Sequence, residues 1–158
     1  MAIEMELPNN KQLFLDDLEV GQRFETGSHA MDEEQIVAFA RQFDPQPFHL
    51  DREAAKSTLF GGLAASGWHT AAITMRLAVG DGAPFAGGMI GLSGEISWPT
   101  PTRPQDVLRA VSEVLEINPS RSRPDRGTVT VRIETLNQND EVRQTLVAKL
   151  IVPRRSQP

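Results

Sequence analysis

The alternation of apolar and polar residues is most regular near the end of the chain. Over residues 128–135, Val129, Val131 and Ile133 alternate with polar residues. A period of two is typical of a strand that buries one face. Turn-forming residues at 137–140 lead into a second apolar run at 142–152. We therefore predict a β-hairpin over these segments.

Two earlier stretches predict helices. In the first, Asp32 can act as an N-cap with Gln35 in capping-box register, ahead of apolar residues at helical spacing. This helix must end near Asp44, because two prolines follow and disfavour helical geometry. The second stretch, 67–79, carries apolar residues on more than one face and little charge. We expect it to be a central helix that is buried on most of its sides.

Residues 23–29 and 89–98 are predicted to be strands. Residues 107–117 are ambiguous, because their apolar positions fit helical spacing at least as well as strand alternation. A strand is assigned there only through the family resemblance given below. Helices early in the chain, strands late and short polar turns favour an antiparallel α+β domain over alternating parallel units.

The length of 158 residues fits one domain. We place it at 12–153, with flexible tails at 1–11 and 154–158. The net charge of −5 argues against a nucleic-acid-binding protein. Because the N-terminus lacks a signal-peptide pattern and no apolar run is long enough to span a bilayer, we expect a soluble, cytoplasmic protein without membrane contacts.

The chain contains no cysteine and only three dispersed histidines. The absence of cysteine excludes thiol nucleophiles, disulfides and cysteine zinc sites, and it agrees with a reducing compartment. The histidines show no metal-ligand spacing, so no metal site is expected. Histidine and carboxylate side chains must therefore carry any chemistry.

The most informative segment is Phe-Asp-Pro-Gln-Pro-Phe-His at 43–49, just past the predicted helix end. Its two prolines stiffen the backbone, so the carboxylate of Asp44 and the imidazole of His49 stand in a fixed relation. Such a pair can orient one water molecule and accept its proton, because imidazole titrates near neutrality. On the residues alone, however, helix capping and ordinary hydrogen bonding explain such pairs more often than catalysis does.

This segment resembles the hydratase motif of the MaoC-like dehydratases and (R)-specific enoyl-CoA hydratases, which is Asp, any residue, Asn, Pro, an aliphatic residue and His. Asp44, Pro47 and His49 match that pattern with its spacing intact. The resemblance continues through 59–77, where the family has a glycine that opens the central helix, and through the closing hairpin to Val152. It therefore covers most of the chain.

The resemblance implies a single hot dog domain, in which an antiparallel sheet wraps around the long helix at 67–79. Two copies would pair as a homodimer, or assemble further as a dimer of dimers or higher, with the active site between subunits. Asp44 and His49 would add water syn across the 2,3-double bond of an acyl-CoA or acyl-carrier thioester, giving the (R)-3-hydroxyacyl product. The backbone N–H of Gly67 would hold the thioester oxygen. No cofactor is implied, since CoA enters only as part of the substrate.

Several positions depart from the family pattern or extend it. Gln46 replaces the motif's Asn, and the serine that assists in known hydratases falls on Met75, so that both positions are candidate substrate contacts. Ser66, next to the oxyanion glycine, either touches substrate or, more simply, caps the helix. Arg121 and Arg123 are candidates for the CoA phosphates, although such a loop is more often only solvated.

Two other functions remain open at this stage. A thioesterase on the same fold would release free thiol, because fold does not fix function. A non-catalytic binding module would hold an acyl ligand without turnover, and Met75 at the assisting position keeps this reading open. Ligand-induced stabilisation without any product would support the binding module.

Overall fold

The computed structural model describes residues 11–155 of the chain. It has one short 3-10 helix, four α-helices and five strands. In chain order they are η1 (Leu15–Asp17), β1 (Arg23–Ala30), α1 (Glu33–Phe43), α2 (Pro47–Leu50), α3 (Arg52–Ala55), α4 (Gly67–Asp81), β2 (Ile90–Ser97), β3 (Val107–Pro119), β4 (Arg126–Leu136) and β5 (Val142–Pro153).

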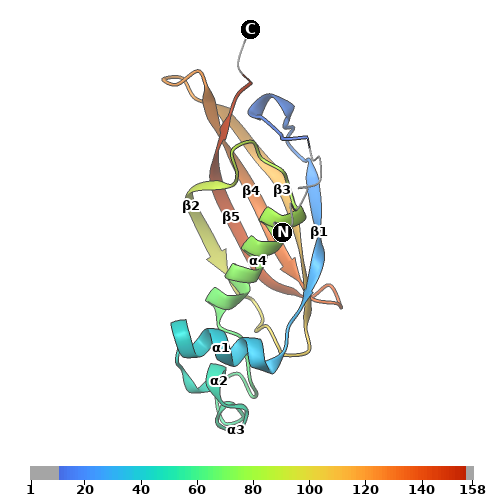
Figure 1. The fold of residues 1–158 in the computed structure, drawn as a ribbon, viewed down its shortest axis with the longest axis vertical. Coiled ribbons are helices and arrows are strands. Elements are labelled where there is room, and N and C mark those ends of the chain that lie inside the picture. The colour runs from blue at the N-terminus through green and yellow to red at the C-terminus, as the bar shows by residue number, and fades with distance from the viewer. Residues whose placement is uncertain (1–10, 156–158) are drawn as a thin grey trace, which may run out of the picture.

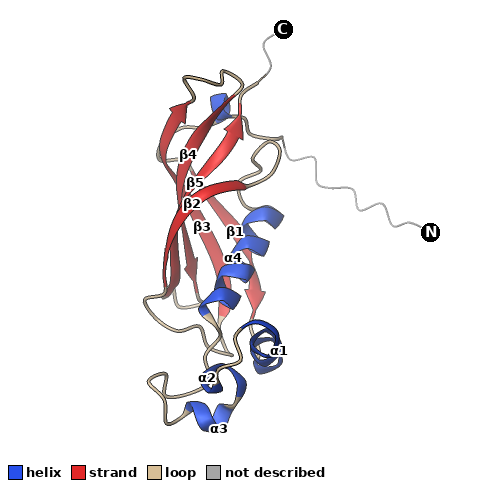
Figure 2. Cartoon of the chain, turned by 90° about the vertical axis from the view of Figure 1, so that its left-hand side faces the viewer, coloured by secondary structure: helices blue, strands red, loops and turns tan. Residues whose placement is uncertain are grey.

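The strands form one antiparallel sheet in the order β1-β3-β4-β5-β2, so that β1 and β2 are its edges. Helix α4 lies along one face of the sheet (Figure 1, Figure 2). This is the antiparallel α+β architecture that the sequence predicts. The ambiguous segment at 107–117 is strand β3.

The core lies between α4 and the sheet. On β4 the side chains of Val129, Val131 and Ile133 are at most 1% exposed, and the residues between them are half-buried. Leu77 of α4 belongs to the same apolar cluster. Burying each such side chain contributes about 1.5–3 kcal/mol, so the period-two pattern of the hairpin is what fixes the sheet against the helix. The predicted hairpin is thereby confirmed.

Helix α4 is less buried than predicted. The face turned to the sheet carries Thr70 and Thr74 as well as Leu77, all buried. On the opposite side Trp68 is 60% exposed and Val79 is 63% exposed. The prediction of a helix buried on most sides is therefore wrong for a single chain, because the sheet of that chain covers only one side of α4.

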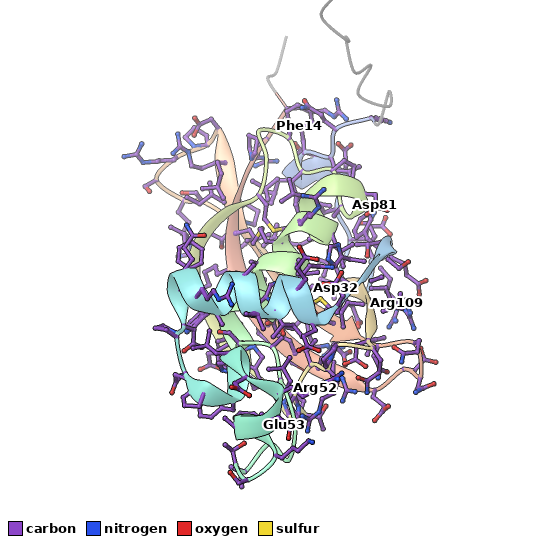
Figure 3. All side chains as sticks on the ribbon, turned by 60° about the horizontal axis from the view of Figure 1, so that its bottom comes forward. Phe14, Asp32, Arg52, Glu53, Asp81 and Arg109 are labelled. Carbon is purple, nitrogen blue, oxygen red and sulfur yellow. The ribbon has the colours of Figure 1, made fainter. Side chains whose placement is uncertain are left out.

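Helices α1, α2 and α3 gather at one end of the sheet, beyond the first turn of α4 (Figure 2). Asp32 caps α1 by accepting from the backbone N–H of Gln35 at 2.8 Å, as predicted. Figure 3 labels Asp32 at the start of α1 and Asp81 at the distant end of α4. The residues between α1 and α4 therefore approach the N-terminus of α4, where the candidate site is found.

The two ends of the described chain are tied together. Arg154 donates to Asp16 at 3.0 Å, and Arg155 donates to Asp17 at 2.7 Å. These two arginines begin the segment for which a flexible tail was expected, and ion pairs hold them to η1. The rest of the expected tails, 1–10 and 156–158, lies outside the described residues.

Candidate active site

The motif segment connects α1 to α2. Asp44 follows the last residue of α1 and donates its backbone N–H to Ala40 at 2.9 Å. Pro47 then begins the single turn of α2, where its missing N–H is not needed. His49 lies in that turn and is 4% exposed. The stiff segment expected from the sequence therefore contains one helical turn that carries the histidine inward.

The ring orientation of His49 is fixed by a buried hydrogen bond. Nδ1 lies 2.7 Å from the carbonyl oxygen of Ala64, and because a carbonyl only accepts, Nδ1 carries the hydrogen. Nε2 then lies 3.3 Å from Oδ2 of Asp44. The two predicted catalytic side chains are thus brought together, with the ring nitrogen that can exchange a proton facing the carboxylate.

The pKa of Asp44 reflects opposing effects. Burial favours the neutral acid, whereas the Ser66 hydroxyl, the Gln46 amide and the charge of His49 favour the carboxylate. Their sum lowers the pKa of Asp44 below its usual range. Nε2 of Gln46 donates to Oδ1 at 2.6 Å. Asp44 is therefore ionised at neutral pH and available to accept a proton from water.

The sequence suggests Gln46 and Ser66 as substrate contacts. In the structure neither lines the cavity, and both act on Asp44 instead. The Gln46 amide is engaged with Asp44. Ser66 is fully buried and accepts from the backbone N–H of Trp68 at 3.3 Å, so it caps α4 as well as acting on Asp44. Ser66 thus orders the first turn of the central helix and also favours the ionised form of Asp44.

Gly67 opens α4, and its backbone N–H has no acceptor among residues 11–155. A free N–H at a helix N-terminus attracts negative charge. A Cβ at Gly67 would lie 2.6–2.9 Å from ring atoms of Trp98. A glycine is needed here because the indole packs on its Cα, a reason that sequence analysis missed. Trp98 is held in turn by Gln144, which accepts from its Nε1 at 2.9 Å.

A cavity of about 280 Å³ adjoins these groups. Two of the predicted residues, His49 and Gly67, line it. The other lining residues come from the loop before α4, from α4 itself, from the β2–β3 connection and from β5. They are Phe60, Ala65, Thr70, Trp98, Thr100, Pro101, Thr102 and Arg143.

Six predicted residues are not among those that line this cavity. Asp44 adjoins it through His49, Gln46 contacts Asp44, and Ser66 directly precedes Gly67. The other three lie elsewhere. Met75 lines a different cavity, together with Met89 and Leu92. Arg121 and Arg123 fall in the connection between β3 and β4. That connection lies at the opposite end of the sheet from α1, α2 and α3 (Figure 1). Within one chain, these arginines therefore do not contribute to the site around His49.

Within residues 11–155, no group of three His, Cys, Asp or Glu side chains is arranged to hold a metal ion. None of the helices in that range is long and apolar enough to cross a membrane.

The chain matches the MaoC like domain family over residues 17–137. The solved MaoC-like dehydratase from Rhodospirillum rubrum is 59% identical, with a TM-score of 0.90 over 92% of this chain and 99% of that one. The unliganded R-hydratase PhaJ1 from Pseudomonas aeruginosa is 27% identical, with a TM-score of 0.71 over 91% and 88% of the two chains. The 3-hydroxybutyryl-CoA dehydratase of Methylorubrum extorquens is 31% identical over 118 residues, which is 74% of this chain and 73% of that protein.

The chain therefore belongs to the MaoC-like dehydratase family, and its fold is a single hot dog domain. Both the resemblance and the fold class inferred from the sequence are confirmed.

Proposed function

We propose that this protein catalyses the reversible addition of water to a 2-enoyl thioester of CoA or of an acyl carrier, giving an (R)-3-hydroxyacyl thioester. The observation that carries the proposal is the pairing of His49 Nε2 with Asp44 Oδ2 at 3.3 Å beside a cavity that Gly67 also lines. The names of the Pseudomonas hydratase and the Methylorubrum dehydratase support the same reaction class.

The two catalytic side chains supply acceptors for one water molecule. In the neutral form of the His49 ring, Nδ1 keeps its hydrogen on Ala64 and Nε2 accepts, and the ionised Asp44 is the second acceptor. A water held by its two hydrogens directs a lone pair at C3 of the substrate. Its oxygen bonds to C3, one of its protons passes to this pair, and the pair returns a proton to C2 on the same side. The product carries the hydroxyl on C3 and the new hydrogen on C2.

Negative charge develops on the thioester oxygen as water adds. In the proposed site the N–H of Gly67 donates to this oxygen, and the dipole of α4 adds to the stabilisation. A single donor of this kind typically contributes about 100- to 1,000-fold in rate. The buried cap at Ser66 holds the first turn of α4, from which this donor projects.

The test is the loss of conjugated enoyl absorbance with crotonyl-CoA and a panel of longer and branched enoyl-CoAs. Asp44→Asn and His49→Gln should each lower kcat/KM by about 100- to 10,000-fold, the range for a general acid–base group. Asp51→Asn is the matched control, because Asp51 only caps α3. Free thiol release would instead indicate a thioesterase, and ligand-induced stabilisation without product would indicate a binding module.

We also propose that the protein works as a homodimer or a higher assembly of dimers. Support comes from an exposed apolar surface, the α4–β2 face, made of Trp68, Met75, Val79, Ile90 and Leu92. Met75 and Leu92 line one cavity, so the helix and the edge strand contribute to a continuous surface. Contiguous apolar surface of this kind marks protein–protein contacts.

A further inference from the structure

The cavity beside His49 has a polar wall that the proposed hydration step does not use. Thr70, Thr102 and Arg143 line this wall and are 1%, 2% and 8% exposed. Buried polar groups are normally hydrogen-bonded, so the donors and acceptors of this wall indicate what the cavity is built to receive.

Arg143 has donors to spare. Its Nε and Nη2 donate to the carboxylate of Asp106 at 2.9 and 3.2 Å, and Nη1 donates to Oγ1 of Thr100 at 3.0 Å. A guanidinium has five N–H groups, so two of them make no hydrogen bond within residues 11–155. Thr100 already donates its own hydroxyl to the carbonyl of Val142 at 2.7 Å.

The threonine pair adds another donor. Oγ1 of Thr70 and Oγ1 of Thr102 are 2.8 Å apart, and this hydrogen bond uses one of the two hydroxyl hydrogens. The other hydrogen has no acceptor in the described part of the chain. The wall therefore contains N–H and O–H groups that can donate hydrogen bonds to an oxygen atom of a ligand.

The charges around the wall favour a neutral oxygen. The buried carboxylate of Asp106 matches the charge of Arg143, and Oε2 of Glu141 lies 4.0 Å from Nη1 of the same arginine. A second carboxylate in the cavity would be a desolvated charge without a free partner, which is costly. A carbonyl or hydroxyl oxygen meets the same donors without that cost.

We propose that the substrate's acyl group carries a neutral oxygen, a carbonyl or a hydroxyl, at its far end, bound by Arg143 and the Thr70–Thr102 pair in the cavity of about 280 Å³. This inference rests on the proposed function, which places the thioester near His49 and Gly67 in the same cavity.

Binding of three saturated thioesters of equal size tests the proposal apart from turnover. They are 4-oxopentanoyl-CoA, 4-methylpentanoyl-CoA and 3-carboxypropanoyl-CoA, which end in a carbonyl, a methyl and a carboxylate. Trp98 lines the cavity and packs against Trp68, the chain's other tryptophan, so binding can be followed by fluorescence. We expect the 4-oxo ligand to bind about tenfold more tightly than the 4-methyl ligand, the effect of one hydrogen bond. Equal affinities, or tightest binding of the carboxylate, would overturn the proposal.

The double variant Thr70→Val, Thr102→Val locates the effect, because removing both partners of a hydrogen bond costs little stability. It should lower the preference for the 4-oxo ligand at least threefold. The control Thr135→Val removes an equally buried hydroxyl that contacts Thr74 and does not line the cavity, so its preference should be unchanged. A preference that survives in the double variant would contradict the assignment to this wall.

Hydration of the corresponding 2-enoyl thioesters separates the two proposals. If crotonyl-CoA and the alkyl enoyl thioester are hydrated and no 4-oxo preference exists, the proposed function stands and the polar-acyl inference fails. If the 4-oxo preference is measured in binding and no enoyl thioester is hydrated, the hydration proposal fails and the polar acyl site stands.

Discussion

Ser66 acts on both halves of the site, because its one hydroxyl caps α4 and also favours the ionised form of Asp44. Burial alone would raise the pKa of that carboxyl group. The donors around the carboxyl group outweigh this effect and lower its pKa, so Asp44 stays ionised at pH values below the usual aspartate pKa. A site that needs an ionised base at neutral pH can therefore bury it without losing its charge.

Ser66→Ala should raise the pKa of Asp44, because burial is then opposed by fewer donors. Since water activation requires the carboxylate, the acidic limb of the kcat/KM profile should move to higher pH. Loss of the cap should also cost about 0.5–2 kcal/mol of stability. Asp32→Ala is the control, because it removes the cap of α1 and leaves the donors to Asp44 in place. An acidic limb that stays in place in Ser66→Ala would mean that the hydroxyl does not sustain the charge.

Gly67→Ala should be destabilising by about 1–3 kcal/mol, the usual cost of overpacking, because the new methyl group meets the Trp98 ring. Trp98→Leu in the same chain should recover part of this loss, since the two positions touch and their effects are not additive. Chemical denaturation of the single and double variants measures both effects. Gly80→Ala, in the same helix with open space around it, should instead stabilise by up to about 1 kcal/mol. Similar losses at both glycines would contradict the packing argument.

At the scale of elements, the sequence predicts strands whose apolar residues alternate regularly, and it does not identify strands whose alternation is broken. The alternation of β4 reads directly as a strand. Strand β3 is ambiguous because it carries apolar residues on both faces. Leu108 and Val114 belong to the core cluster, whereas Val107 and Val111 lie on the other face of the strand, and together they imitate helical spacing.

The same limit holds for the site. Asp44 and His49 lie five positions apart on one stiff segment, so their spacing is visible in the sequence. Trp98, Arg143 and Gln144 approach Gly67 and His49 only because β2, β5 and α4 pack together. No local pattern marks these three residues, and only the assembled fold identifies them as parts of the cavity and its support.

The packing of α1 on α4 should make stability depend on pH through His69. Its ring stacks on Phe39 with centroids 4.6 Å apart, and burial together with the charge of His29 lowers the pKa of His69 to about 4. The unfolded chain binds this proton below about pH 6.5 and the folded chain does not. The free energy of unfolding should therefore fall between about pH 6.5 and about 4, by at most about 1.4 kcal/mol per pH unit from this group.

Urea denaturation at about pH 7 and at about pH 5 measures the decrease in the free energy of unfolding, because His69 of the unfolded chain becomes protonated between these two pH values. His69→Phe keeps an aromatic ring against Phe39 and removes the titrating group, so the decrease should be smaller in the variant than in the natural chain. An equal decrease in both proteins would assign the pH dependence to other residues.

For the whole molecule, the α4–β2 face is the surface that a single chain leaves unexplained. Its side chains are 42–63% exposed, and strand β2 is an edge with unpaired backbone groups on its outer side. A second copy could cover both the helix and the edge strand. Stable interfaces bury about 800 Å² on each partner, an area that needs many residues. The α4–β2 face draws its residues from two elements and is therefore a better candidate than a single exposed side chain.

Leu92→Lys should weaken the proposed dimer, because it places a charge on the α4–β2 face where it would lose its water. We expect the dimer dissociation constant to rise at least about tenfold, which corresponds to about 1.4 kcal/mol, as measured by sedimentation velocity over a dilution series. Val20→Lys is the control, since Val20 is 65% exposed and precedes β1 at the opposite edge of the sheet. Because the proposed active site lies between subunits, kcat/KM for an enoyl thioester should fall as the Leu92→Lys protein dissociates and stay constant in Val20→Lys. A natural chain that sediments as a monomer throughout the series, with full activity, would contradict both the dimer and the shared site.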